Sequence, residues 1–128
     1  PEGPPVWTAL NFLSSMIREA RETKVLRMSL APDSEKDYVL LDDVVKILVR
    51  LAISGVHQVY NVASGENIRH STIAEIVSAE LGLKILWDKG PTVKYPPISV
   101  QRISDEFLFF PSKVGDSIKN LAAHFSKD

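Results

Sequence analysis

Residues 36–65 constrain the fold of this chain more than any other segment. They read KDYVLLDDVVKILVRLAISGVHQVYNVASG, which predicts a short strand, a helix over residues 42–54 and a second strand over residues 59–63. Apolar side chains in the helix recur at intervals of three and four, so they form a broad stripe. The second strand is a nearly continuous run of β-branched and aromatic residues, which is typical of strands covered on both faces. The segment therefore predicts a mixed α/β fold.

Both ends of the predicted helix carry recognisable signals. Asp42 and Asp43 are expected to cap its first turn, because their carboxylates accept free backbone N–H groups and complement the helix dipole. Gly55 is expected to end the helix in the left-handed conformation. The two aspartates have no histidine or third carboxylate at ligand spacing, so the sequence predicts no metal site here.

The sequence before this segment predicts one more helix and one more strand. Apolar residues spaced by three and four indicate an amphipathic helix from Val6 to about Glu22. Residues 24–30 alternate in polarity, which is typical of a half-buried strand. This strand and the one at residues 36–41 are separated by a turn containing Pro and Asp, so we expect them to form a hairpin.

The sequence after it predicts two further helices. A helix is expected to begin at His70 or Ser71 and to end at Leu81, with Ser71 as a candidate N-cap, and a short strand is expected at 83–87. Residues 98–103 are expected to be extended, and a closing helix is expected over residues 112–125. The chain as a whole predicts an α/β fold with about four helices and short strands.

Composition limits the classes of protein to consider. The 128 residues are 45% hydrophobic and 24% charged, which suits one globular core, so we expect residues 1–128 to form a single domain or a fragment of one. The net charge of −1 gives no support for binding nucleic acid or an anionic membrane. No apolar run is long enough to span a bilayer, cysteine is absent and the chain does not begin with Met. We expect a cytoplasmic protein cut from something longer.

Three motifs in one order carry a resemblance to a known family. They are KDYVLLDDV at residues 36–44, VYNVASGE at residues 59–66 and AELG at residues 79–82. In this order they resemble the C-terminal part of the extended short-chain dehydrogenase/reductase family, the NAD-dependent nucleoside-diphosphate-sugar epimerases and dehydratases. The resemblance implies the C-terminal, substrate-binding portion of that fold, without its N-terminal Rossmann half.

The cofactor and catalytic motifs of that family are missing. The glycines show neither G-x-x-G-x-x-G nor G-x-G-x-x-G spacing, and none of the three tyrosines has a lysine four residues on. The first pattern holds a dinucleotide pyrophosphate, and the lysine of the second lowers the pKa of the catalytic tyrosine. We therefore expect no catalytic residue and no bound cofactor in this segment, with NAD or NADP bound in a full-length parent.

The resemblance implies a small set of substrate-binding residues. Lys36 and Tyr38 match the R-D-[FY] motif, whose arginine reaches the sugar-nucleotide pyrophosphate in related enzymes. Lysine keeps the charge but loses the planar donor geometry, so a solvated lysine at a strand end is the alternative. In sequence, Lys94 or Arg102 lies closest to the position of a second arginine of the family. Asn61 is expected to be buried and hydrogen-bonded, whereas the three histidines are isolated in sequence.

Three interpretations of function stay open. The first is the substrate-binding segment of an NAD(P)-dependent nucleotide-sugar epimerase or dehydratase, catalytically silent alone. The second is an independent, non-catalytic α/β binding or assembly module derived from that fold, and the third is an unrelated small domain. Expected partners are a nucleotide-sugar substrate and either a second copy of the chain or the N-terminal Rossmann half. We expect a second copy or the Rossmann half because a strand at 59–63 without a neighbouring strand would leave the backbone N–H and C=O groups of its edge unpaired.

Overall fold

The computed structural model describes residues 12–126, which form five helices and four short strands. In chain order these are α2 (Phe12–Thr23), β1 (Val25–Met28), β2 (Glu35–Asp37), α3 (Leu41–Ser54), β3 (Asn67–Arg69), α4 (His70–Leu81), β4 (Lys84–Trp87), α5 (Gln101–Phe107) and α6 (Val114–Ser126). The mixed α/β class and the helices near 71–81 and 112–125 are thus confirmed. The helix predicted from Val6 is confirmed as α2 from Phe12 onward, and its earlier residues lie outside the described range.

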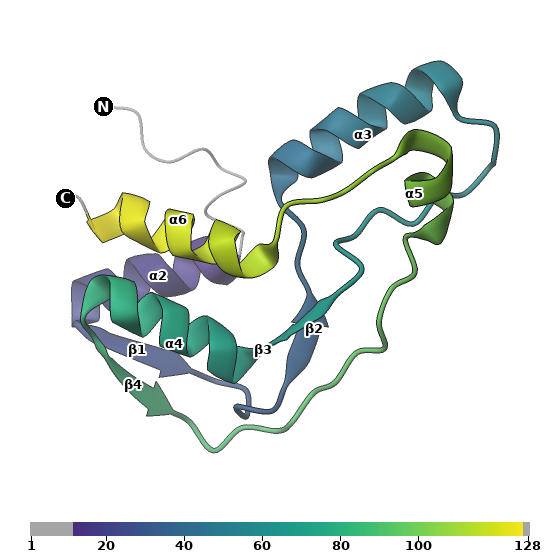
Figure 1. Cartoon of the computed structure of the whole chain (residues 1–128). Helices are drawn as coiled ribbons and strands as arrows, with labels where there is room; N and C mark the ends of the chain where they lie inside the picture. The colour runs from purple at the N-terminus through teal and green to yellow at the C-terminus, as the bar shows by residue number, and fades with distance from the viewer. Residues whose placement is uncertain (1–11, 127–128) are drawn as a thin grey trace.

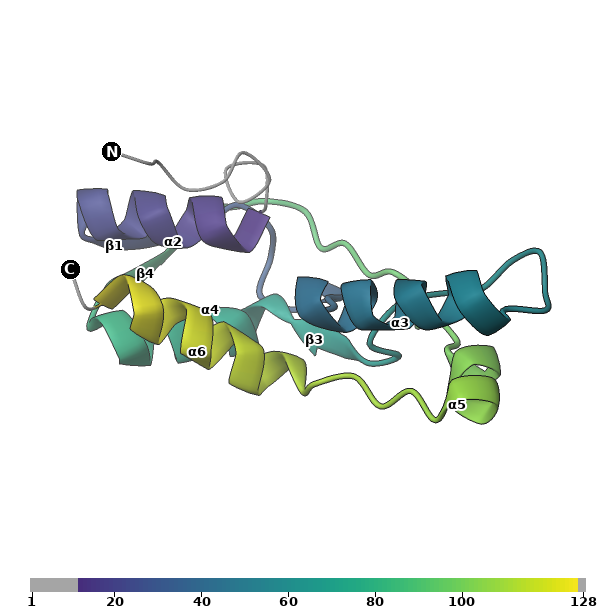
Figure 2. The same cartoon turned by 90° about the horizontal axis from the view of Figure 1, so that it is seen from above.

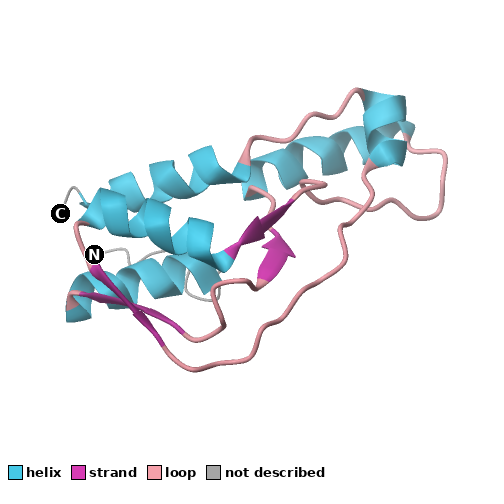
Figure 3. Cartoon of the chain, turned by 60° about the horizontal axis from the view of Figure 1, so that its bottom comes forward, coloured by secondary structure: helices cyan, strands magenta, loops and turns pink. Residues whose placement is uncertain are grey.

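The molecule is elongated, with its helices gathered at two ends (Figures 1 and 2). At one end α2, α4 and α6 pack together beside β1 and β4. At the other end lie α3 and the short helix α5, and β2 and β3 cross the middle. A long segment after β4 runs the length of the molecule to reach α5 (Figure 3). The fold therefore places β2, which carries Lys36, between two separate groups of helices.

The strands form two small sheets rather than the predicted hairpin. β1 pairs with β4 in parallel, with Val25 opposite Lys84. β2 pairs with β3 in antiparallel fashion, with Lys36 opposite Ile68. The predicted pairing of residues 24–30 with 36–41 is therefore wrong. Alternating polarity specifies which face of a strand is buried but not which strand lies beside it.

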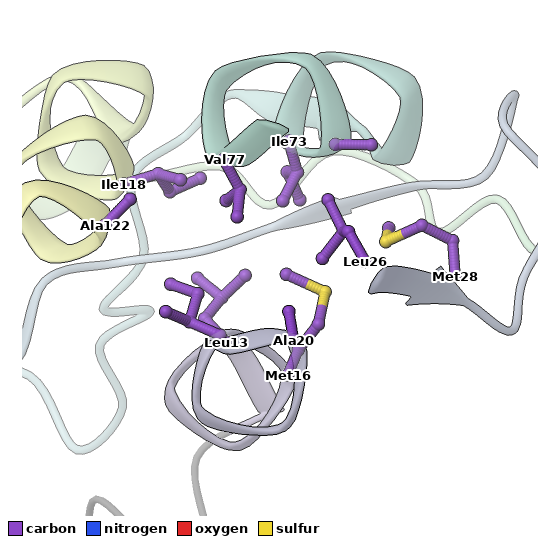
Figure 4. Close-up of a cluster of buried hydrophobic side chains, with 11 residues drawn as sticks. Leu13, Met16, Ala20, Leu26, Met28, Ile73, Val77, Ile118 and Ala122 are labelled. Atoms are coloured by element: carbon purple, nitrogen blue, oxygen red, sulfur yellow. The ribbon is translucent and has the colours of Figure 1, made fainter. Parts of the chain in front are cut away.

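The main core lies between α2, β1, α4 and α6 (Figure 4). Leu26 and Met28 project from β1 into the space between α2 and α4, and both are almost fully buried. Ile118 and Ala122 of α6 close the side of this cluster. Five other buried members come from the predicted apolar stripes and are Leu13, Ile17, Ala20, Ile73 and Val77, and Met16 and Ala74 join them.

A second, smaller cluster joins α3 to α5. Ile47 is the one buried residue of α3, and it packs with Ile103, Phe107 and Phe109. The extended structure predicted for residues 98–103 is wrong from residue 101 onward, because α5 begins at Gln101. Ile103 and Phe107 stand four residues apart, so a helix is what turns both toward Ile47.

The predicted strand at residues 59–63 is also not formed. None of its residues pairs with a strand in the described part of the chain. It is not covered on both faces either, since Val59 is 68% exposed and Asn61 is exposed as well. A strand requires a neighbour to satisfy its N–H and C=O groups, and residues 12–126 supply none for this segment.

The ends of the helices depart from prediction in several places. Leu40 is the N-cap of α3 and no side chain caps the first turn, so the capping role of Asp42 and Asp43 is wrong. Gly55 ends α3 with a φ of −65°, not in the left-handed conformation. Helix α4 begins at His70 without a side-chain cap, so Ser71 is not its N-cap.

Candidate functional site

A cleft of about 210 Å³ opens beside β2. It is lined by Glu35, Lys36, Tyr38, His70 and Tyr95, together with the aliphatic side chains of Leu30 and Val93. Two of the four predicted substrate-binding residues, Lys36 and Tyr38, are thus brought to one site. Its polar groups are an ammonium, a carboxylate, two phenols and an imidazole.

Three segments that are distant in sequence build this cleft. Strand β3 lies along β2 and leads directly into α4, so His70 arrives next to the strand. The segment around Lys94 lies on the other side, where Glu35 N–H donates to the Val93 carbonyl at 3.0 Å and Tyr95 N–H donates to the Glu35 carbonyl at 3.2 Å. Backbone hydrogen bonds on both sides of β2 therefore fix the positions of the lining residues.

Lys36 lies between two tyrosine rings. Its Nζ is 5.8 Å from the ring centre of Tyr38 and 5.7 Å from that of Tyr95. Both distances fall within the range of a cation–π contact, which contributes about 0.5–1 kcal/mol at exposed sites. The lysine side chain itself is exposed. The rings thus hold an ammonium group, with three N–H donors, at the mouth of an open cleft.

His70 and Tyr38 form the inner wall of the cleft. The Tyr38 hydroxyl and His70 Nε2 are 3.5 Å apart, and His70 is only 3% exposed. Burial, followed by the nearby charge of Lys36, lowers the pKa of His70 below its usual value, so the imidazole is neutral at pH 7. Burial and the neighbouring Tyr95 raise the pKa of Tyr38, which keeps its phenol protonated. The positive charge of the site at neutral pH is therefore that of Lys36.

Asp37, the next residue on β2, has a different task. One of its carboxylate oxygens accepts the Ser64 N–H at 2.9 Å, and the other accepts the Gly65 N–H at 2.8 Å. The polar turn that follows residues 59–63 is thereby fastened to the strand that carries Lys36. Sequence reasoning assigned this residue no role, although it belongs to the same motif as Lys36.

The other two predicted binding residues do not join this cleft. Lys94 lies opposite Glu35 in a parallel bridge, but its side chain is exposed and is not part of the lining. Arg102 is located near the far end of the molecule, where its Nη1 donates to the Val59 carbonyl at 2.7 Å. It lines a separate cleft with Asn61, whose side-chain amide donates to the Ser99 carbonyl at 3.1 Å. Asn61 is hydrogen-bonded as predicted, but the prediction that it is buried is wrong.

Sequence reasoning found only Lys36 and Tyr38 among the lining residues, and His70 and Tyr95 were missed along with Glu35, Leu30 and Val93. His70 was isolated in sequence, and Tyr95 stands in a proline-rich loop. Both reach Lys36 only through the pairing of β2 with β3 and with the segment around Lys94. No local pattern signals these pairings, so a tertiary structure is needed to find them.

Residues 12–126 contain no group of three or more histidine or acidic side chains arranged to hold a metal ion. Within the same range, none of the helices is long and apolar enough to cross a membrane.

Comparison with known proteins places the fold. No family model matches the chain, and no curated protein matches it. Among solved structures, it is similar to dTDP-glucose 4,6-dehydratase from Bacillus anthracis in complex with NAD, with a TM-score of 0.79 and 18% identity over 94% of this chain and 40% of that one. RMD from Pseudomonas aeruginosa, complexed with NADPH, matches with a TM-score of 0.74 and 20% identity over 93% of this chain and 43% of that one. A UDP-galactose 4-epimerase matches with a TM-score of 0.70 and 21% identity over 91% and 40%.

These matches confirm the fold that the sequence motifs indicated. The chain has the fold of one part of an extended short-chain dehydrogenase/reductase of the nucleotide-sugar epimerase and dehydratase kind. It spans about two fifths of the length of these proteins.

Proposed function

We propose that this chain is the substrate-binding segment of a nucleotide-sugar epimerase or dehydratase, and that it is catalytically silent by itself. The observation that carries the proposal is the exposed ammonium of Lys36, which lies between Tyr38 and Tyr95 at the mouth of a cleft. Two of the similar structures are a dTDP-glucose 4,6-dehydratase and a UDP-galactose 4-epimerase, which makes a nucleoside diphosphate sugar the natural ligand class to test.

The cleft offers suitable groups for the diphosphate part of such a ligand. A lysine ammonium binds phosphate as a compact positive charge, and the protonated Tyr38 hydroxyl is a hydrogen-bond donor. The carboxylate of Glu35 at the same cleft opposes an anion, although part of its hydrogen-bonding capacity is used by Asn67 at 3.3 Å. With one ammonium and one carboxylate present, we expect weak binding, with a Kd in the millimolar range.

The experiment is a titration of the 128-residue chain with UDP-glucose and with dTDP, followed by NMR chemical shifts. Lys36→Ala should weaken binding by at least fivefold. Lys94→Ala is the matched control, because it removes the same charge from a nearby residue that does not line the cleft. Equal affinities for the parent chain and Lys36→Ala would remove Lys36 from the site.

In the whole enzyme, NAD or NADP would be held by an N-terminal dinucleotide-binding half. This segment has no glycine-rich turn of that kind and no tyrosine with a lysine four residues on. Calorimetry of the chain with NAD or NADP should therefore give no saturable heat. Saturable binding of either cofactor at micromolar concentration would contradict the proposed silence of the segment.

A further inference from the structure

Tyr95 lines the cleft beside β2 and still exposes much of its surface to solvent. The residue is 51% exposed, and the centre of its ring lies 5.7 Å from Lys36 Nζ at the mouth of the cleft. Within residues 12–126 its hydroxyl makes no hydrogen bond and its ring stacks on no other aromatic ring. The outer part of the ring is therefore open to a ligand.

The other two tyrosines of the chain are engaged inside the fold. The Tyr60 hydroxyl accepts two backbone N–H groups of the preceding turn, at 2.9 and 3.1 Å. Tyr38 is half-buried, and its hydroxyl lies 3.5 Å from His70 Nε2. Packing and hydrogen bonding within the fold explain why a tyrosine stands at these two positions. They do not explain the exposed ring of Tyr95.

The backbone that carries Tyr95 is held in place. Its N–H donates to the Glu35 carbonyl at 3.2 Å, and its carbonyl accepts the side-chain amide of Asn67 at 2.7 Å. Pro96 and Pro97 follow directly, and a proline ring fixes its own φ. The ring therefore stands on a rigid support, so a ligand that contacts it orders little additional backbone.

The cleft is large enough for only part of a nucleoside diphosphate sugar. Its volume is about 210 Å³, whereas typical small-molecule pockets have about 300–1,000 Å³. When a phosphate group contacts the Lys36 ammonium at the mouth, one end of the ligand extends outside the cleft. Tyr95 presents its ring beside that end.

A nucleobase suits this exposed ring better than a sugar does. Every base has a flat π-face that stacks on an aromatic side chain. A sugar instead presents hydroxyl groups, and these find hydrogen-bonding partners inside the cleft, where the Tyr38 hydroxyl and the His70 imidazole form the wall. The base is thus the part of the ligand expected outside, on the ring.

We propose that Tyr95 stacks on the base of a nucleotide whose phosphate contacts Lys36, so that the cleft selects nucleotides over phosphorylated sugars. This inference rests on the proposed function, because a phosphate at Lys36 is what brings the base within reach of the ring. Tyr95 is then the residue that gives the site its preference for a nucleotide.

NMR titration of the 128-residue chain with UMP and with ribose 5-phosphate tests the proposal. Both ligands carry a ribose and one phosphate, but only UMP has a base. UMP should bind at least about fivefold more tightly, which is the lower end of base–aromatic stacking. Tyr95→Ala should bring the ratio of the two dissociation constants close to one, whereas Tyr95→Phe keeps the ring and should preserve the ratio. Ile98→Ala is the matched control, because Ile98 is a 42% exposed apolar residue of the same segment that does not line the cleft.

The ratio separates this inference from the proposed function. Lys36→Ala should weaken both ligands alike; if it changes neither affinity, the phosphate site is wrong, while the ratio still decides whether Tyr95 recognises a base. A ratio near one in the unaltered chain, no measurable binding of UMP, or a ratio that persists in Tyr95→Ala would overturn the role of Tyr95.

A second measurement uses the unaltered chain and so does not depend on the folding of a variant. With UMP bound, nuclear Overhauser effects should connect the uracil protons to the ring protons of Tyr95. Effects that connect this ring to the ribose protons alone would overturn the proposal and assign the ring to the sugar.

Discussion

Replacing Asp37 with alanine tests whether its carboxylate holds the turn after residues 59–63 in place. The carboxylate accepts two backbone N–H groups, from Ser64 and Gly65, at 2.9 and 2.8 Å. Hydrogen bonds to a charged group contribute about 1.5–3 kcal/mol each. Because these are only partly buried, water replaces some of each one, and we expect a total loss of about 2.5 kcal/mol in the free energy of unfolding.

This loss corresponds to a measurable change in melting temperature. An unfolding entropy of about 2.1 cal/mol/K per residue gives about 0.27 kcal/mol/K for 128 residues, so Tm should fall by about 9 °C. Urea unfolding followed by circular dichroism should show a lower midpoint with an unchanged slope. Asp37→Asn keeps one acceptor oxygen and should lose about half as much stability as Asp37→Ala.

The matched control is Asp33→Ala, which removes an exposed aspartate from the turn before β2. Exposed substitutions of this kind usually change stability by less than about 0.5 kcal/mol. If Asp37→Ala were as mild as Asp33→Ala, the two hydrogen bonds would contribute nothing and the reasoning would be refuted. Equal losses in Asp37→Asn and Asp37→Ala would show that the two N–H groups do not act separately.

Two further predictions concern backbone strain and pH. Gly65 has a φ of +85°, and an added Cβ would come within 2.9 Å of Val100 Cγ2. Gly65→Ala should therefore lower the free energy of unfolding, measured in urea, by about 2 kcal/mol. Gly82 has a φ of +65°, and no atom lies within 4 Å of its added Cβ. Gly82→Ala should therefore lower the free energy of unfolding by only about 1 kcal/mol. Equal losses in the two variants would exclude a contribution from Val100. The pKa of His70 is lowered, mainly by burial and then by Lys36, so the unfolded chain binds the proton more readily, and stability should fall as pH drops below about 6.5. The urea midpoint measured from pH 7.5 to pH 5 should show this fall in the parent chain, and an equal fall in His70→Gln would assign it to another group.

Much of the fold was predictable from local pattern. The stripes that bury Ile17, Ile73 and Ile118 all appear as apolar residues at intervals of three and four. The helix after Ser71 and the strand at residues 83–87 were located to within a few residues. Such patterns work because a side chain's face is set by its position along the helix or strand, whatever the element packs against.

The elements that prediction missed depend on contacts from elsewhere in the chain. Helix α5 is seven residues long, and Ile103 and Phe107 define its buried face only because Ile47 lies opposite. Asp43 resembled a helix cap, but its carboxylate accepts the Ser112 N–H at 2.8 Å instead. Nothing near Asp43 in sequence indicates that competing donor.

The sequence by itself determined the α/β class and the resemblance to one part of a larger fold, and it singled out Lys36 and Tyr38 as candidate binding residues. The tertiary structure decided which strands pair, and so brought His70 and Tyr95 to Lys36 while leaving Lys94 outside the cleft and Arg102 at a separate one. It also decided that residues 59–63 do not form a strand. The physical reason is that a helix satisfies its backbone hydrogen bonds within one segment, whereas a strand or a cleft depends on segments distant in sequence.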